Sequence, residues 1–110
     1  MLIPNITSHD AIKICNSFRL TSSQEFVSSE SYILHCGEEI TEEMLSVNEF
    51  EELGLMENDP LNVILLEVEE DGETLFISMI YTLTNNNTAQ VYSLVRQNEN
   101  MDLLKVVNVY

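Results

Sequence analysis

The sequence predicts an α+β fold in which two helices pack on one face of an antiparallel β-meander of four to five strands. Apolar residues recur at helical spacing in the first half, whereas long β-branched or aliphatic runs alternate with short polar turns in the second. A chain of 110 residues with 45% hydrophobic content can also close one modest core. We therefore expect a single compact domain, with a helical front half at about 7–53 and the meander at about 61–110.

The first predicted helix follows Thr7 or Ser8, either of which can act as its N-cap. Asp10 falls in the first turn, where a carboxylate favours the helix dipole. We expect the helix to end near Arg19 or Leu20. Its apolar face carries Ala11, Ile12, Cys15 and Phe18.

A loop and a short strand are predicted next. Residues 21–29 are rich in serine and threonine, which is typical of a loop. Tyr32 to Cys36 form a short β-prone run, and Gly37 then interrupts it.

The second predicted helix runs from about Glu42 to Leu53. Thr41 precedes it as a candidate N-cap, acidic residues fill its first turn, and Gly54 follows its end. Its apolar stripe consists of Met44, Leu45, Val47, Phe50 and Leu53.

A β-hairpin is predicted after the second helix, whose end signals are the clearest in the sequence. Asp71-Gly72 is a preferred pair for a two-residue type I′ turn, and it separates two β-rich runs, Leu61 to Glu70 and Glu73 to Leu83. This turn pairs Glu70 with Glu73, and hence Val68 with Leu75, Leu66 with Ile77 and Ile64 with Met79. Two further strands are expected around Gln90 to Gln97 and Leu103 to Tyr110, after short asparagine-containing turns.

Charge is distributed very unevenly along the chain. The formal net charge is -15, and no lysine or arginine occurs between Arg19 and Arg96, although most of the 19 acidic residues lie there. Direct binding to nucleic acid or to an anionic membrane is not expected, because the chain has only 4 basic residues to neutralise phosphate. A strongly negative surface field instead favours a basic partner.

The location predicted from the sequence is cytoplasmic. The N-terminus lacks a basic region followed by a long apolar run, and no segment has the roughly eighteen apolar residues of a membrane span. In that compartment Cys15 and Cys36 are expected to be reduced core residues.

The sequence offers little for catalysis, and we predict that the protein is not an enzyme. His9 and His35 are the only histidines, and the 3 glycines are too scattered for a phosphate-binding loop. The segment from Glu67 resembles the start of a calcium loop, but Ser78 stands where that loop needs a bidentate glutamate. We therefore predict no catalytic, cofactor-binding or metal-binding residues.

Protein binding is the remaining class of function. We predict a non-enzymatic acidic inhibitor that blocks a basic nucleic-acid-binding protein, such as an immunity protein to a nuclease toxin or a phage blocker of a DNA- or RNA-binding defence enzyme. The predicted contact residues form two groups, Glu38, Glu39, Glu42, Glu43, Glu49, Glu51 and Glu52 around the second helix and Glu67, Glu69, Glu70, Asp71 and Glu73 at the hairpin. Candidate aromatic anchors are Tyr32, Tyr81, Tyr92 and Tyr110.

Two alternative functions remain open. A small acidic secretion-type chaperone would hold an effector client on exposed apolar surface, for which Met44, Met56, Met79 and Met101 are suitable residues. A structural subunit would use its charge only for solubility and would have no separable partner. A homodimer is compatible with all of these functions, because an edge strand can pair with a second copy.

Overall fold

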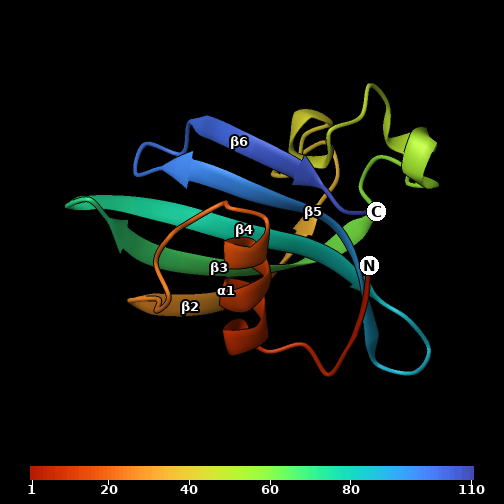
Figure 1. Ribbon diagram of the computed structural model, residues 1–110. Coiled ribbons are helices and arrows are strands. Elements are labelled where there is room, and N and C mark those ends of the chain that lie inside the picture. The colour runs from red at the N-terminus through yellow and green to blue at the C-terminus, as the bar shows by residue number, and fades with distance from the viewer.

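The computed structural model describes residues 1–110 as one six-stranded antiparallel sheet with one α-helix and two short 3₁₀ turns (Figure 1). The strands are β1 (Leu2–Pro4), β2 (Ser28–His35), β3 (Pro60–Glu70), β4 (Glu73–Leu83), β5 (Thr88–Asn98) and β6 (Leu103–Asn108). Their order is β1-β5-β4-β3-β2, and β6 pairs with β5 further along the edge that β1 also uses. The predicted antiparallel meander is confirmed, and the fold is mostly β.

The hairpin between β3 and β4 has the predicted turn and register. Asp71 and Gly72 both have positive φ, at 53° and 80°, as a type I′ turn requires. Glu70 pairs with Glu73, and the ladder continues with Leu66 opposite Ile77. Apolar residues therefore face one another along the two longest strands.

Helix α1 (Ser8–Ser17) also forms where it was predicted. Thr7 is its N-cap, and the Thr7 hydroxyl accepts a hydrogen bond from the Asp10 backbone N–H at 3.2 Å. The Asp10 carboxylate accepts from the Thr7 N–H in return, which completes a capping box. The helix ends a little earlier than predicted, and Ala11, Ile12 and Cys15 are its buried residues.

The predicted second helix over 42–53 is wrong. The segment forms two 3₁₀ turns, η1 (Glu43–Leu45) and η2 (Phe50–Leu53), separated by Ser46 in the left-handed region and Glu49 in extended backbone. Its apolar residues repeat every three positions, which matches the three residues per turn of a 3₁₀ helix. Repulsion among its glutamates, with no lysine to offset it, also disfavours a long α-helix. The caps were predicted better, because Thr41 accepts from the Met44 N–H and Gly54 ends η2 in the left-handed conformation.

The sheet is covered on both faces, so the prediction that two helices share one face is also wrong. Side chains alternate between the faces of each strand, and each set packs against a different segment. On one face, Ile64 and Leu66 pack with α1, and we call this the helix face. On the opposite face, Val63 and Ile80 pack with η1, η2 and the loop that follows, and we call this the turn face.

The front half of the chain is less helical than predicted, because it also supplies β1 and β2. Strand β2 begins at Ser28, earlier than the predicted Tyr32, and β1 was not predicted at all. Cys15 and Cys36 are free and buried in the two different core clusters, and burial raises the pKa of the Cys15 thiol to about 12. None of the helical segments has the length and apolar character needed to cross a bilayer.

Candidate protein-binding face

The end of β3 sends neighbouring carboxylates to opposite faces of the sheet. Glu67 and Glu69 are an even number of residues from Val63 on the same strand, so they lie on the turn face. Glu70 is an even number of residues from Leu66 and therefore lies on the helix face. The hairpin residues that were predicted as one contact group are thus divided by the sheet.

Glu70 is held by contacts within the protein. Its carboxylate lies 2.8 Å from Arg96 Nη1, and it accepts hydrogen bonds from the Ser22 N–H at 2.6 Å, the Ser22 hydroxyl and the Thr21 hydroxyl. The Ser22 N–H is the largest cause of a lowered Glu70 pKa, and Arg96 adds to the effect. Glu70 therefore fastens the loop after α1 to the hairpin, which leaves it little capacity for a partner.

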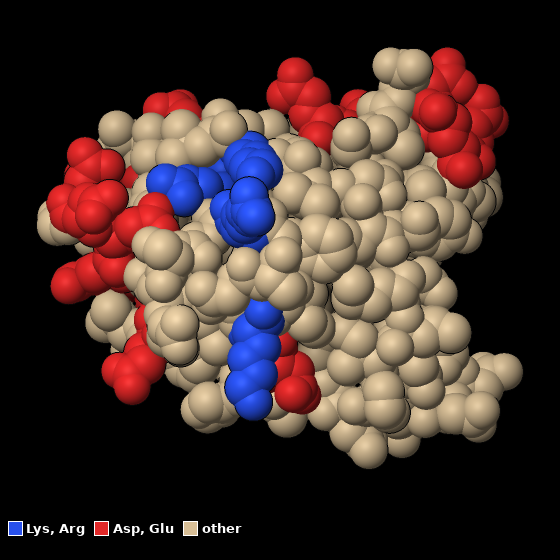
Figure 2. Space-filling model, viewed as in Figure 1, with Lys and Arg blue, Asp and Glu red and all other residues tan.

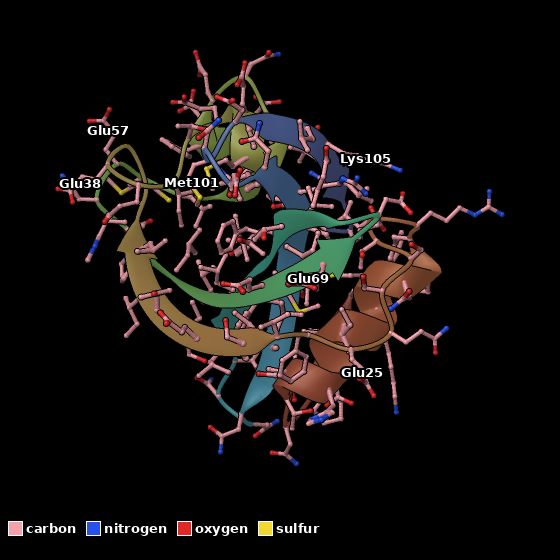
Figure 3. All side chains as sticks on the ribbon, turned by 90° about the vertical axis from the view of Figure 1, so that its left-hand side faces the viewer. Glu25, Glu38, Glu57, Glu69, Met101 and Lys105 are labelled. Carbon is pink, nitrogen blue, oxygen red and sulfur yellow. The ribbon has the colours of Figure 1, made fainter.

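A hollow lies on the turn face, beside the part of the sheet that η1 and η2 leave uncovered. Its volume is about 350 Å³, and its lining is mainly apolar. The lining residues are Tyr32, Leu34, Glu39, Met44, Val63, Leu65, Ser78, Gln97 and Met101, and we call this hollow the acidic groove for the charges around it. In Figure 3 the labelled Met101 lies above β2 and β3, the strands from which Tyr32, Leu34, Val63 and Leu65 line the groove.

Carboxylates lie in and beside the acidic groove. Glu39 is part of its wall, and Glu30, Glu67 and Glu69 project from β2 and β3 on the same face as Leu65. Glu30 is opposite Leu65 and accepts a hydrogen bond from the Tyr32 hydroxyl. The groove therefore combines a mainly apolar lining with negative charge beside it.

All the basic residues lie on the other side of the sheet. Lys13 is on α1, and Arg19 follows this helix. Arg96 lies on the same face of β5 as the core residue Leu94, and it is directly opposite Lys105 on β6. Figure 2 shows this helix face, where lysine and arginine form a central band with carboxylates at the hairpin end and at the upper right. No lysine or arginine is on the turn-face side of the strands.

The glutamates of η1 and η2 form a second acidic cluster at the opposite end of the molecule from the hairpin tip (Figure 1, upper right; Figure 2). Glu52 accepts hydrogen bonds from the N–H groups of Asn48 and Glu49 at 2.7 Å, so part of its role is to cap η2. A hydrogen bond with Glu51 is the largest cause of a raised Glu49 pKa, and the nearby charges of Glu52 and Glu42 add to it. Glu43 and Glu51 are exposed.

The remaining residues that were predicted to contact a partner follow β2 or lie at the hairpin tip. Glu38 and Glu39 follow β2, where the His35 Nδ1 atom is 4.0 Å from Glu39 Oε1. His35, Glu38 and Glu39 are the side chains that could hold a metal ion, since their ligand atoms lie within 4.8 Å of one another. However, Glu39 Oε1 already accepts the His35 backbone N–H at 3.2 Å. At the other end, Asp71 and Glu73 are exposed at the hairpin tip.

Sequence reasoning missed Leu34, Leu65 and Gln97 in the groove lining, and Glu30 beside the groove. The polar run Ser28-Ser29-Glu30-Ser31 lacks the apolar alternation that marks a strand, so β2 was predicted too short. Of the four tyrosines, Tyr32 lies at the groove with 40% of its surface exposed. Tyr81 and Tyr92 are buried, and Tyr110 stacks on Tyr92 with a ring separation of 5.2 Å.

The fold and this face define a small antiparallel β protein whose two sheet faces differ in charge and in closure. Comparisons of the chain with protein-family models, with curated proteins and with solved structures find no match.

Proposed function

We propose that this protein is a non-enzymatic acidic inhibitor that binds and blocks a basic nucleic-acid-binding protein, such as a nuclease toxin or a DNA- or RNA-binding defence enzyme. The observation that supports this most is the lack of internal neutralisation. Among the 19 acidic residues, Glu70 alone is paired with a lysine or arginine, through Arg96. The other carboxylates have no lysine or arginine within the molecule to neutralise them, although some, such as Asp10 and Glu52, accept backbone hydrogen bonds.

The physical mechanism is electrostatic steering followed by close contact. A face with carboxylates and no cation attracts a basic surface, and such complementarity can raise the association rate by about 10²-fold or more at low salt. The partner's phosphate-binding lysines and arginines then meet Glu30, Glu67 and Glu69 instead of a nucleic-acid backbone. Desolvated contacts with Tyr32 and the apolar floor would slow dissociation.

The test has two stages, because the partner must first be identified. The purified chain is immobilised, and a lysate from its source or its host is eluted through a rising salt series. We expect a basic nucleic-acid-binding protein to be released at elevated salt, because exposed ion pairs are screened. The isolated partner is then titrated with nucleic acid in the presence of the chain. Inhibition of nucleic-acid binding supports the proposal, whereas simultaneous binding of both would contradict it.

Two charge-reversed variants locate the inhibitory surface. The groove variant combines Glu30→Lys, Glu67→Lys and Glu69→Lys. Its matched control combines Glu25→Lys, Glu57→Lys and Glu99→Lys, which changes the net charge equally at exposed positions outside the predicted contact residues. We expect the groove variant to lose inhibition by at least about tenfold and the control to lose much less. Equal loss in both variants would show that only total charge matters.

One observation favours a chaperone as a second candidate. Met44 and Met101 line the acidic groove, and Met56 is exposed on the surface. Met79, by contrast, is a core residue. Methionine-rich apolar surface can adapt to varied clients. If the protein is a chaperone, binding should persist at high salt and unfolded proteins should compete for the site. If it is an inhibitor, binding should weaken at high salt and unfolded proteins should not compete.

A further inference from the structure

Strand β2 is an open edge of the sheet. It comes last in the strand order, and Figure 3 shows no element beyond it on its outer side. Edge strands are usually protected by proline, lysine, bulges or a covering segment. Residues 28–35 contain neither proline nor lysine, and their pairing with β3 is regular throughout.

Backbone groups of β2 point away from the sheet at alternate residues. In an antiparallel ladder, residues alternate between directing both backbone groups at the partner strand and directing both away. Cys36 donates its N–H to the Asp59 carbonyl across this ladder, so Ser31 and Ile33 have the outward orientation. The backbone N–H of His35, which also points away from β3, donates to the Glu39 side chain. The free N–H groups of Ser31 and Ile33 are therefore ready to pair with another strand.

The open edge adjoins the acidic groove. Tyr32 and Leu34 contribute to the groove wall from β2 itself, so a strand added to β2 would place alternate side chains above that wall. Glu30 lies on the turn face as well. Ile33, with 64% of its surface exposed, adds an apolar side chain to β2 on the helix face. A second copy of this chain is a poor occupant, because it would bring the same glutamates against these ones.

We propose that an extended segment of a basic partner adds to β2 as a strand, and that its side chains on the turn-face side are lysines or arginines at the end near Glu30, Glu67 and Glu69 and apolar at the end near Tyr32 and Leu34. This proposal rests on the proposed function, because it specifies how the basic partner binds. Backbone pairing would give affinity, and the groove would select the side chains.

The test uses a peptide, so it does not depend on identifying the natural partner. The probe is a capped peptide of about ten residues in which every second residue is lysine in one half and valine in the other, with threonine between them, and its control has glycine in place of valine and threonine. Amide hydrogen exchange of the full chain is measured by NMR with each peptide. We expect the lysine–valine peptide to slow exchange at Ser31 and Ile33 by at least about tenfold and the control peptide to have little effect.

Substitution of one residue separates strand pairing from charge. Ile33→Pro removes an outward N–H without removing a hydrogen bond to β3, whereas the control Ile33→Val keeps that N–H and a β-branched side chain. We expect the proline variant to bind the lysine–valine peptide at least about tenfold more weakly and the valine variant to bind it like the parent. Amide spectra of β3 and β4 in both variants check that the sheet is intact, and the exchange measurement on the parent needs no variant.

Three results would overturn the proposal. Equal binding of the two peptides without protection of Ser31 and Ile33 would mean that the face attracts cations without strand pairing, and the inhibitor function would survive. Protection that rises with protein concentration alone, accompanied by dimers in sedimentation, would assign the edge to a second copy. Peptide protection confined to η1 and η2 would place the binding site elsewhere. The inhibitor function fails by a different result, namely an identified partner that still binds nucleic acid in the presence of the chain.

Discussion

The two faces of the sheet are built from the same strands but differ in almost every physical respect. The helix face is closed by α1, contains the larger core cluster and carries the basic residues. The turn face is only partly closed by η1 and η2, and its uncovered part is the acidic groove. One surface is thus neutralised and packed, whereas the other is left charged and open.

This difference arises from the alternation of side chains along β3. Leu65 and Leu66 are neighbours in the chain, yet Leu66 is fully buried on the helix face while Leu65 is half-buried in the groove. Glu69 and Glu70 repeat the contrast with charge, since Glu69 is exposed and Glu70 is bound to Arg96. Neighbouring residues of the same type therefore provide matched tests.

The largest expected effect distinguishes the two leucines. Leu66→Ala removes a fully buried side chain from the helix-face core and should lower the free energy of unfolding by about 2–5 kcal/mol. Leu65→Ala should cost less than about 1.5 kcal/mol, because its side chain is already partly in water. Urea denaturation measures both values. Similar losses would mean that the groove floor is as tightly packed as the core.

A smaller effect should distinguish the two glutamates. Glu70→Gln weakens the ion pair with Arg96 and the charged hydrogen bonds to Thr21 and Ser22, and we expect a loss of about 1–3 kcal/mol. Glu69→Gln should change the free energy of unfolding by no more than about 0.5 kcal/mol, because Glu69 is exposed. Both are measured in urea at neutral pH. A neutral Glu70→Gln variant would show that this pair does not fasten the loop.

The same substitution should also change the dependence of stability on pH. The Glu70 pKa is lowered below its ordinary value of 4.5 by folding, so its stabilisation is complete above that pH and is lost as the pH falls through the folded-state pKa. The difference in stability between the parent and Glu70→Gln should therefore shrink from about pH 7 to about pH 3. Denaturation of both proteins at the two pH values checks this. A difference that grew in acid would have the wrong sign.

The smallest effect concerns the acidic cluster at the turns. Hydrogen bonding with Glu51 is the largest cause of the raised Glu49 pKa, so Glu51→Ala should lower that pKa toward its ordinary value. NMR titration of the Glu49 side-chain carboxyl measures the shift. Glu43→Ala is a suitable control, because Glu43 does not contribute to the perturbation of Glu49. An unchanged Glu49 titration in Glu51→Ala would show that the two carboxyls do not share a proton.

Local sequence signals predicted the elements whose geometry depends on neighbouring residues. Asp71-Gly72 determined a turn with two positive φ values and therefore the register of β3 with β4. Thr7 and Asp10 determined the start of α1 in the same way. The second helix failed because its cap signals were real but its three-residue repeat and crowded glutamates favoured short 3₁₀ turns.

The sequence by itself determined the excess of carboxylates, the hairpin and the antiparallel meander, because charge and turn chemistry are properties of the residues and their immediate neighbours. Only the tertiary structure decided which carboxylates are available. Arg96 approaches Glu70 through the pairing of β3, β4 and β5, and the long polar start of β2 becomes a strand only because β3 supplies its hydrogen bonds. Contacts between residues distant in the chain neutralise Glu70 on one face and leave Glu39 in an open groove on the other, and no local pattern encodes those contacts.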